Sequence, residues 1–180
     1  MKLITKADNL WSFYSNNPEK FEVRDNLIKK YINYVLAIVC LVLIFISGFI
    51  PFPVWLVRTA AVVGFVYFGF SIFIGSKEVH NKAGGGVVKG PVIKKFDMRI
   101  CNEAELINAF NSRDFDTLIA ASEADDMSVQ LNIEEDKVGK ELYLILMKYY
   151  SSSDYRSVTD VTVLSGSDYD KWADVLNGYS

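Results

Sequence analysis

Two long runs of apolar residues dominate the first half of the chain. Residues 32–50 contain no charged side chain, and residues 54–74 contain one, Arg58. Each run is close to the ~20 residues that an α-helix needs to cross a hydrocarbon layer about 30 Å thick. The segment 51–53 between them holds two prolines, which cannot continue a helix. The pattern therefore predicts a hairpin of two transmembrane helices over residues 32–74.

Two other interpretations of the apolar runs fit less well. A cleaved signal peptide would begin near the first residue, whereas the first run here follows 31 largely polar residues and precedes no small-residue cleavage site. A buried hairpin of a soluble protein would need a far larger body to cover it than a chain of 180 residues offers. We therefore expect a membrane protein.

Basic residues precede the first run and follow the second, whereas none lies in the turn between them. An excess of Lys and Arg marks the cytoplasmic side of a membrane protein. The distribution predicts a multi-pass membrane protein with both ends in the cytoplasm, which in a bacterium means the inner membrane. The residues concerned are Lys20, Arg24, Lys29 and Lys30 before the spans, and Lys77, Lys82, Lys89, Lys94 and Lys95 after them.

Three positions in the second span indicate contacts within the membrane. Arg58 could line a pore or face a partner helix, or it could extend to the lipid headgroups from about one turn below the outer surface. Ala60 and Gly64 form a small-xxx-small pair, which lets two helix backbones approach closely. That approach could occur within the hairpin or between the subunits of a homo-oligomer, and the sequence leaves both alternatives open.

The segments beside the hairpin are predicted from their turn residues. Residues 1–31 read as two short amphipathic helices, the second starting at Pro18 and continuing into the first span. They could lie in the membrane interface, on the cytosolic domain or on another subunit. Residues 75–91 contain three consecutive glycines without the spacing of a phosphate-binding loop, and they predict a flexible linker. Residues 92–180 predict one cytosolic α+β domain.

Changes of periodicity divide this domain into short elements. The expected order is β-α-β-β-α-β-α, the split βαβ arrangement of ferredoxin-like domains with one added helix. In that fold the helices cover one face of the sheet and leave the other open. The expected strands are residues 92–100, 117–123, 127–133 and 158–164, with a turn at Asp125-Asp126, and the expected helices are 102–111, 136–150 and a last one capped by Ser167.

The open face of that sheet is the candidate binding site. Lys95 and Arg99 on the first strand would share it with Gln130, Asn132 and Thr162. Cations beside neutral hydrogen-bonding groups suit a small anionic ligand, and a phosphate-rich nucleotide fits this chemistry. The alternatives are a solvated face or a face buried against a neighbouring subunit.

Charge is divided unevenly along the chain, although the net charge is only −3. Residues 1–101 contain 13 Lys and Arg against 6 Asp and Glu, whereas residues 102–180 contain 6 against 16. The basic part flanks the apolar runs, as expected near anionic lipid. The acidic part is poorly suited to duplex nucleic acid, whose binding depends on neutralising phosphates. We expect the lipid bilayer to be a partner and duplex nucleic acid not to be one.

Residue types that carry catalysis or bind metals are scarce. His80 is the single histidine, and the two cysteines, Cys40 and Cys101, fall in different predicted parts of the chain. No metal site and no pairing of a nucleophile with a base follows from them. The three carboxylates at 134–136 are better explained as the start of a helix. We expect a protein that is not an enzyme and uses no metal or other cofactor.

In size and order of parts the chain resembles the membrane-bound accessory effectors of type III CRISPR systems. In that family a short two-helix membrane part precedes a compact cytosolic domain that senses cyclic oligoadenylate, and a nuclease motif is absent here. The resemblance implies an oligomeric effector of antiviral defence that binds a cyclic nucleotide and then perturbs the membrane. Lys94, Lys95 and Arg99 are compatible with phosphate recognition in such a domain.

Two other classes of protein also fit the sequence. The chain could be a structural component of an envelope or secretion assembly, with a domain that docks a cytoplasmic protein. It could also be an immunity protein that binds a membrane-targeting toxin. An acidic domain suits basic partners in either case.

Overall fold

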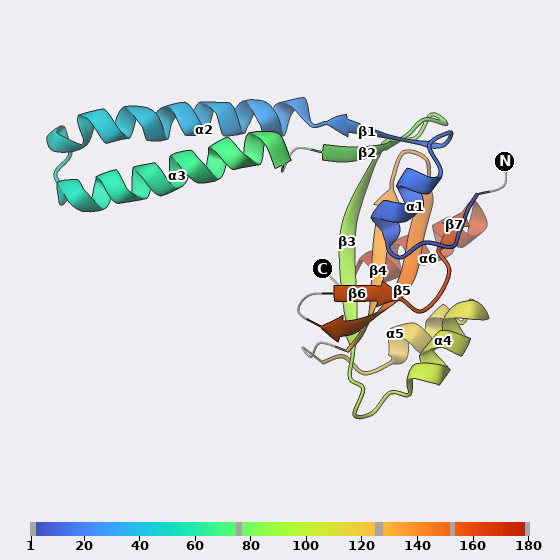
Figure 1. Cartoon of the computed structure of the whole chain (residues 1–180). Helices are drawn as coiled ribbons and strands as arrows, with labels where there is room; N and C mark the ends of the chain where they lie inside the picture. Colours follow the sequence, from blue (N-terminus) through green and yellow to red (C-terminus); the bar gives the residue numbers. More distant parts are fainter. Residues whose placement is uncertain (1–2, 75–76, 125–127, 152–153, 179–180) are drawn as a thin grey trace. The chain divides into compact units, whose positions relative to one another are not determined.

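The computed structural model describes residues 3–74, 77–124, 128–151 and 154–178 (Figure 1). It divides into two compact units, which we call the helical hairpin and the α+β unit. The helical hairpin is Val23–Glu78, and the α+β unit combines Met1–Glu22 with Val79–Ser180. The hairpin is therefore inserted within the sequence of the α+β unit, a topology that the apolar pattern alone does not predict.

Two long helices form the hairpin. α2 (Leu27–Ile46) begins after Asn26, whose side-chain oxygen accepts a hydrogen bond from the backbone N–H of Lys29. A short 3-10 helix, η1 (Ser47–Phe49), leads into the turn, and α3 (Val54–Ile74) returns beside α2 (Figure 1). Because Asn26 caps the helix, α2 starts at Leu27, before the apolar run that begins at residue 32.

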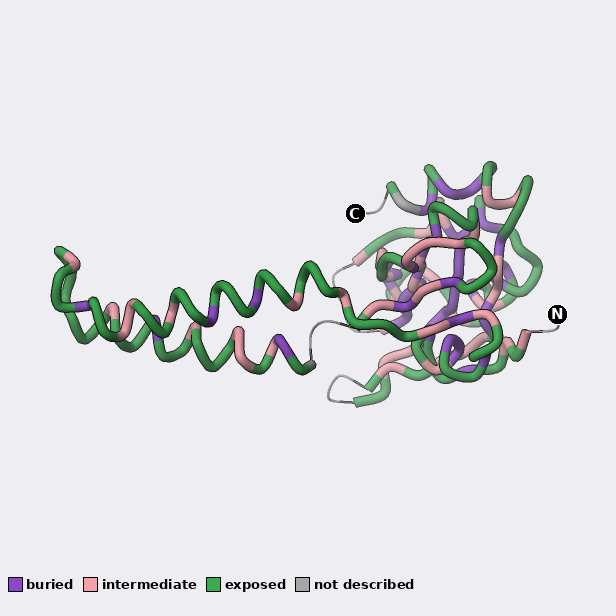
Figure 2. The backbone as a smooth tube through the Cα atoms, turned by 90° about the horizontal axis from the view of Figure 1, so that it is seen from above, coloured by how far each residue is buried: buried purple, intermediate pink, exposed green. Residues whose placement is uncertain are grey.

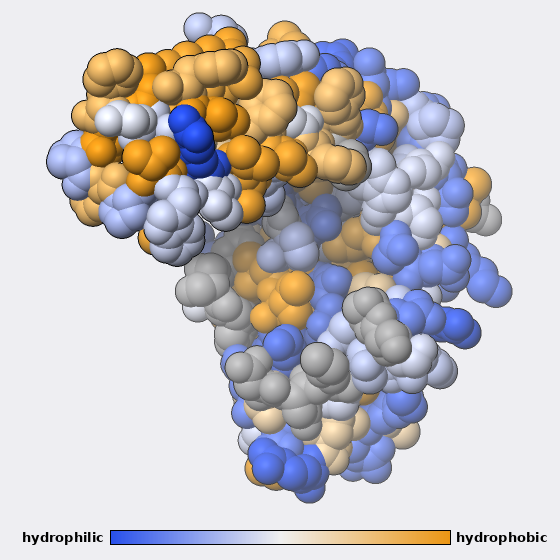
Figure 3. All heavy atoms as spheres, turned by 60° about the vertical axis from the view of Figure 1, so that its left-hand side comes forward, coloured by the Kyte–Doolittle hydropathy of each residue, from blue (hydrophilic) through white to orange (hydrophobic). Residues whose placement is uncertain are grey.

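The surface of the hairpin is largely apolar. Buried side chains recur at helical spacing, among them Asn33 and Ala37 on α2 and Ala61 on α3. Most other positions are exposed (Figure 2), and hydrophobic side chains gather over the hairpin surface (Figure 3). By length and composition alone, Leu27–Phe49 and Val54–Phe73 could each cross a membrane.

The α+β unit is built on a curled, seven-stranded sheet (Figure 1). Its strands follow one another in space in the order in which they occur along the chain, except that β7 pairs with β5. The pairs from β2 onward are antiparallel. The strands are β1 (Phe21–Asp25), β2 (Lys77–Asn81), β3 (Val87–Phe96), β4 (Val129–Asp136), β5 (Glu141–Ser151), β6 (Asp154–Ser157) and β7 (Thr162–Ser165).

Three helices cover one face of this sheet and form the first core. They are α4 (Glu103–Asn111), α5 (Phe115–Ala120) and α6 (Ser167–Asn177). As predicted, Asn102 caps α4 through the backbone N–H of Ala104. The helices and strands bury their apolar side chains together, including Phe96, Phe110, Phe115, Leu131, Ile133, Leu142, Leu144, Leu146, Leu164 and Trp172.

The other face of the sheet, which we expected to be open, is covered by the start of the chain. α1 (Leu10–Asn16) and the residues around it pack there and form the second core. The rings of Phe13, Tyr14, Phe21 and Tyr143 contact one another with centroids 4.8 to 6.0 Å apart. Residues that precede the hairpin and residues that follow it therefore share one core.

The helix predicted over residues 136–150 is wrong, because most of that segment is β5. Leu142 and Leu144 point into the first core, while Tyr143 and Ile145 point into the second. A strand covered on both faces carries apolar residues at every position, so its sequence shows no period of two. The predicted ferredoxin-like order of elements is therefore not confirmed. The structure shows a curled antiparallel sheet with helices.

Residues 117–123, predicted as a strand, contain most of α5 instead. The carboxylate of Asp114 accepts hydrogen bonds from the backbone N–H and the hydroxyl of Thr117, which caps the helix. Phe115 and Leu118 lie three residues apart and are both buried in the first core. The cap and this spacing favour a helical turn over a strand.

The regions that flank the hairpin also differ from expectation. The sequence predicts a second N-terminal helix from Pro18 onward, but the structure has strand β1 there. Phe21 of this strand is buried in the second core. Residues 75–91 hold β2 and the beginning of β3 where a flexible linker was expected, although 75–76 lie outside the described residues.

The remaining strand predictions are partly correct. β4 confirms the strand expected from residue 127, with Val129, Leu131 and Ile133 buried as predicted. The strand expected over 158–164 is shorter, since β7 begins at Thr162. The last helix starts at Ser167 rather than being capped by it, because Gly166 at φ +60 forms the N-cap. The predicted turn at Asp125-Asp126 lies outside the described residues.

Candidate functional site

The cations of the predicted anion site are already engaged within the protein. Lys94 is 1% exposed in β3, and its Nζ donates to the carbonyl oxygen of Ile119 at 2.6 Å and lies 3.1 Å from a carboxylate oxygen of Glu123. An ammonium group that is buried and paired in this way stabilises the contact between β3 and the residues after α5. It does not present its charge to a ligand from solution.

Arg99 lies beyond the end of β3, in a turn. Its guanidinium donates to both carboxylate oxygens of Asp97, with Nε–Oδ1 at 2.8 Å and Nη2–Oδ2 at 2.7 Å. These hydrogen bonds lower the pKa of Asp97 below its ordinary value. The arginine predicted to bind an anion therefore already holds a carboxylate of its own turn.

The neutral residues of the predicted site lie on two faces of the sheet. Lys95 pairs with Gln130 across β3 and β4, and Gln130 donates to Asn132 at 2.8 Å. Thr162 lies opposite Leu144, on the face of the first core. Since Lys94 also points to that face, the six predicted ligand-binding residues are not brought together.

The positions singled out in the second span have different surroundings. Arg58 is exposed and its Nε donates to the hydroxyl of Ser47 at 2.9 Å. Gly64 packs against Cys40 of α2, where an added Cβ would lie 2.8 Å from the Cys40 sulfur. Ala60 is exposed. The small residue at 64 thus serves close packing within the hairpin.

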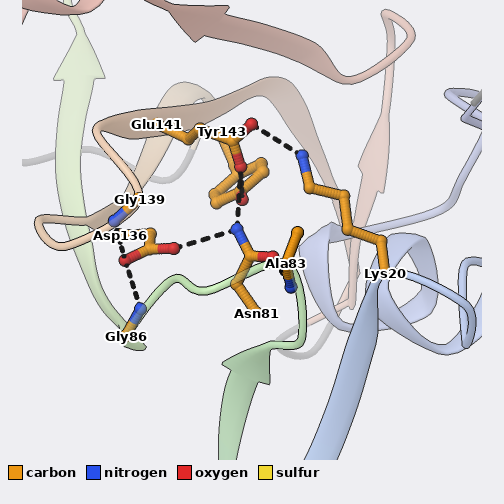
Figure 4. Close-up of polar contacts among 8 residues, drawn as sticks. All are labelled: Lys20, Asn81, Ala83, Gly86, Asp136, Gly139, Glu141 and Tyr143. Atoms are coloured by element: carbon orange, nitrogen blue, oxygen red, sulfur yellow. Dashed lines mark hydrogen bonds and ion pairs between the residues drawn. The ribbon is translucent and has the colours of Figure 1, made fainter.

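A different polar cluster is the most organised one in the α+β unit (Figure 4). At its centre Asp136 is fully buried between the β2–β3 turn and the β4–β5 turn. Its Oδ1 accepts hydrogen bonds from the backbone N–H groups of Gly86 at 2.8 Å, Val138 at 3.1 Å and Gly139 at 2.8 Å. Its Oδ2 accepts from the side-chain amide of Asn81 at 3.0 Å. One carboxylate thereby holds two turns together.

The cluster extends from Asn81 to a second carboxylate (Figure 4). The amide of Asn81 also donates to Glu141 Oε2 at 3.0 Å, and its carbonyl accepts from the backbone N–H of Ala83 at 3.1 Å. Glu141 accepts from the hydroxyl of Tyr143 at 2.5 Å and binds the ammonium of Lys20 at 2.7 Å. Lys20 thus connects the residues before the hairpin to β5.

Burial raises the pKa of two side chains in this region, Tyr143 and Glu134. Burial, followed by the hydrogen bond to Glu141, raises the pKa of Tyr143 far above its ordinary value. Tyr143 therefore keeps its proton at physiological pH and donates it in the hydrogen bond to Glu141. Burial likewise raises the pKa of Glu134, whose carboxylate accepts from Tyr14 at 2.9 Å. Among the described residues, no three His, Cys, Asp or Glu side chains are grouped to hold a metal ion.

A shallow hollow of about 360 Å³ lies beside the cluster. Two lysines line it, and both ammonium groups have partners: Lys20 binds Glu141, and Lys82 donates to the carbonyl oxygen of Pro18 at 2.6 Å. The hollow is lined by Leu3, Glu19, Lys20, Lys82 and Ala83.

This cluster does not follow from the sequence pattern above, although the sequence contains two signals for it. Gly85 and Gly139 are both required, because a Cβ on either would clash with the Asp136 carboxylate. By pattern alone, the glycines at 84–86 predict a flexible linker and Asp136 predicts the start of a helix. A buried acceptor next to glycine-rich turns explains both features at once.

Comparisons with protein-family models, with curated proteins and with solved structures give no match.

Proposed function

We propose that the chain is a two-span protein of the bacterial cytoplasmic membrane, whose α+β unit acts at the inner surface by binding a partner rather than by catalysis. The second core carries this proposal. Phe13, Tyr14 and Phe21 precede the hairpin, Tyr143 and Ile145 follow it, and all five are buried in one cluster. Side chains that share a core lie on one side of a membrane, and an even number of spans between them satisfies that requirement.

The charges beside the spans support a cytoplasmic position for the α+β unit. Lys29 and Lys30 lie in the first turn of α2, and Lys77 begins β2. The turn between the spans, residues 47–53, contains no charged residue. An excess of Lys and Arg at one end of a hairpin keeps that end in the cytoplasm.

A binding role is supported by the distribution of charge on the helical layer. The carboxylates of the buried cluster are occupied by hydrogen bonds within the protein, whereas most of those on the helices are exposed. An exposed acidic layer favours a protein partner with a basic surface. A component of an envelope or secretion assembly, or an immunity protein, would use such a layer. The exposed acidic residues include Glu105 on α4, Asp116 on α5, and Asp170 and Asp174 on α6.

Sensing of a cyclic oligoadenylate by an antiviral homo-oligomer stays a prediction. The neighbouring residues Lys94 and Lys95 point to opposite faces of β3 and do not support it. The melting temperature of the full-length protein in detergent, measured with and without added ligand, tests this prediction. A ligand that binds only the folded state raises that temperature by mass action. A rise with cyclic but not with linear oligoadenylate would establish sensing, and the docking proposal expects no change with either.

Membrane topology tests the proposed two spans and the cytoplasmic position of the α+β unit. A reporter that is active only in the cytoplasm is fused to the N-terminus in one strain and to the C-terminus in another. Both fusions should be active, and the protein should stay in membranes washed with alkaline carbonate. As a control, removal of residues 54–74 should move the C-terminal reporter across the membrane and silence it. Activity at one end of the intact chain only would contradict the proposal.

A further inference from the structure

The turn that joins α2 to α3 exposes an unusual set of side chains. Phe49 is 91% exposed, Phe52 66% and Trp55 70%. No charged residue lies between them, and Arg58 follows within one helical turn of Trp55. A loop that projects into water normally carries polar turn residues instead. The composition of this turn is that of a membrane interface, where aromatic rings meet lipid headgroups.

The direction of α3 places the arginine at the same level as the aromatic rings. Side chains on an α-helix tilt toward its N-terminus, and α3 begins at the turn, at Val54. The long side chain of Arg58 therefore extends toward the turn. Its Nε donates to the hydroxyl of Ser47, the first residue of η1, at 2.9 Å. Among the described residues, Ser47 is the hydrogen-bond partner that the structure gives to Arg58, which leaves two terminal nitrogens for a ligand.

The length of α2 fixes the depth of the turn once the hairpin spans the membrane. Its 20 residues, at about 1.5 Å each, extend roughly 30 Å, which matches the hydrocarbon thickness. Lys29 and Lys30 stand at the cytoplasmic end of this helix. The far end of α2 therefore reaches the outer boundary of the hydrocarbon layer and extends little beyond it.

From these three observations we infer that Ser47–Arg58 is a binding site for a phospholipid headgroup of the outer leaflet. The guanidinium of Arg58 donates to the lipid phosphate, and the rings of Phe49, Phe52 and Trp55 lie in the interfacial layer around it. Arginine suits this role because its planar fork binds phosphate oxygens in pairs. The inference rests on the proposed function, since it requires that the hairpin spans the membrane.

Tryptophan fluorescence of the full chain in phosphatidylcholine vesicles tests the depth of the turn. The chain has three tryptophans, so Trp11→Phe with Trp172→Phe leaves Trp55 as the reporter. Lipids brominated near the headgroup should quench Trp55 more than lipids brominated deep in the chain, and aqueous iodide should quench it least. A second reporter, Phe65→Trp with Trp55→Phe added, should be quenched most by deep bromine.

The two reporters separate failure of this inference from failure of the proposed function. If iodide quenches Trp55 most while deep bromine quenches the residue-65 reporter, the hairpin spans but the turn projects into water. If neither reporter responds to brominated lipid, the hairpin does not enter the bilayer and the proposed function is wrong.

The phosphate contact is tested by solid-state magnetic resonance of protein with 13C-labelled arginine guanidinium groups. In phospholipid vesicles, 31P should dephase a component of the signal that disappears in Arg58→Gln, which assigns that component to Arg58. In vesicles of a phosphorus-free galactolipid with inorganic phosphate, this component should be absent. Its absence in phospholipid, or its presence with free phosphate alone, would overturn the assignment to a lipid headgroup.

Discussion

The hairpin and the α+β unit use the same apolar residue types in opposite ways. Val62, Val63 and Phe70 on α3 are exposed, whereas Leu142 and Tyr143 in β5 have no exposed surface. A helix satisfies its own backbone groups, so its apolar side chains can face lipid. A strand must bond to its neighbours, and here both faces of the sheet are then covered by other elements.

This contrast shows what a run of apolar residues does and does not specify. α3 has 21 residues and β5 has 11, and both are apolar at most positions. Length separates them, because 11 residues in a helix would cross only about half of a bilayer.

Removal of residues 1–20 should abolish the fold of the α+β unit. It takes Phe13 and Tyr14 out of the second core and uncovers Tyr143, Ile145 and their neighbours. The truncated chain in detergent should lose cooperative thermal unfolding of its β-structure by circular dichroism, while still entering membranes. Trp11→Ala, at an exposed position of α1, is the control and should unfold like the intact chain. A normal transition in the truncated chain would show that the second core is dispensable.

Asp136→Asn should destabilise the α+β unit by about 2–4 kcal/mol, because it weakens charge-assisted hydrogen bonds and places an amide against backbone donors. Asparagine keeps only one of the two oxygens, so an acceptor is lost either for the backbone N–H groups of Gly86 and Gly139 or for the side-chain amide of Asn81. Chemical unfolding measures the effect, with Asp116→Asn on the exposed face of α5 as the control. Equal midpoints for the two variants would mean that the carboxylate does not hold the turns together.

Gly64→Val should loosen the hairpin by about 1–3 kcal/mol through overpacking against Cys40, without altering the α+β unit. Gly69→Val is a matched control, since a Cβ there meets no atom within 4 Å. Spin labels attached to unnatural side chains on α2 and α3, which leave Cys40 in place, report the separation of the helices. The distance distribution should broaden for Gly64→Val alone. Identical broadening in both variants would argue against close packing at residue 64.

Glu134 should give the smallest effect, a dependence of stability on pH. Burial raises its pKa in the folded chain, so just above the ordinary glutamate pKa the folded state binds more protons than the unfolded state. Stability therefore falls as the pH rises through this window to the folded-state pKa. Glu134→Gln should remove that part of the fall, and Glu105→Gln on the exposed face of α4 should not. Unfolding midpoints of the wild type and both variants over a pH series measure this difference. Parallel curves for wild type and Glu134→Gln would contradict a contribution from Glu134.

The hairpin could be predicted because its signal is local. Nineteen uncharged residues and a turn with two prolines identify a long apolar helix without any knowledge of what surrounds it. Helix α4 was predictable for the same reason, from Asn102 as a cap and a regular apolar stripe. Inward-facing Val129, Leu131 and Ile133 were predictable from their period of two.

The α+β unit could not be predicted because its organisation depends on distant residues. β5 is covered on both faces, and the second cover comes from α1, more than a hundred residues earlier in the chain. That cover also closes the sheet face on which an anion site was expected. Lys94 could not be interpreted from the sequence for the same reason. Only the folded structure shows that its ammonium group binds the carbonyl oxygen of Ile119 and the carboxylate of Glu123.

Excision of the hairpin tests most directly whether a membrane insert interrupts one folded unit. β1 and β2 are neighbours in the sheet, so an Asn-Gly turn can join Asp25 to Lys77 in place of residues 26–76. The account predicts that this shortened chain is water-soluble and unfolds cooperatively by circular dichroism. A shortened chain that stays in the membrane fraction, or that has no folded structure in solution, would contradict it.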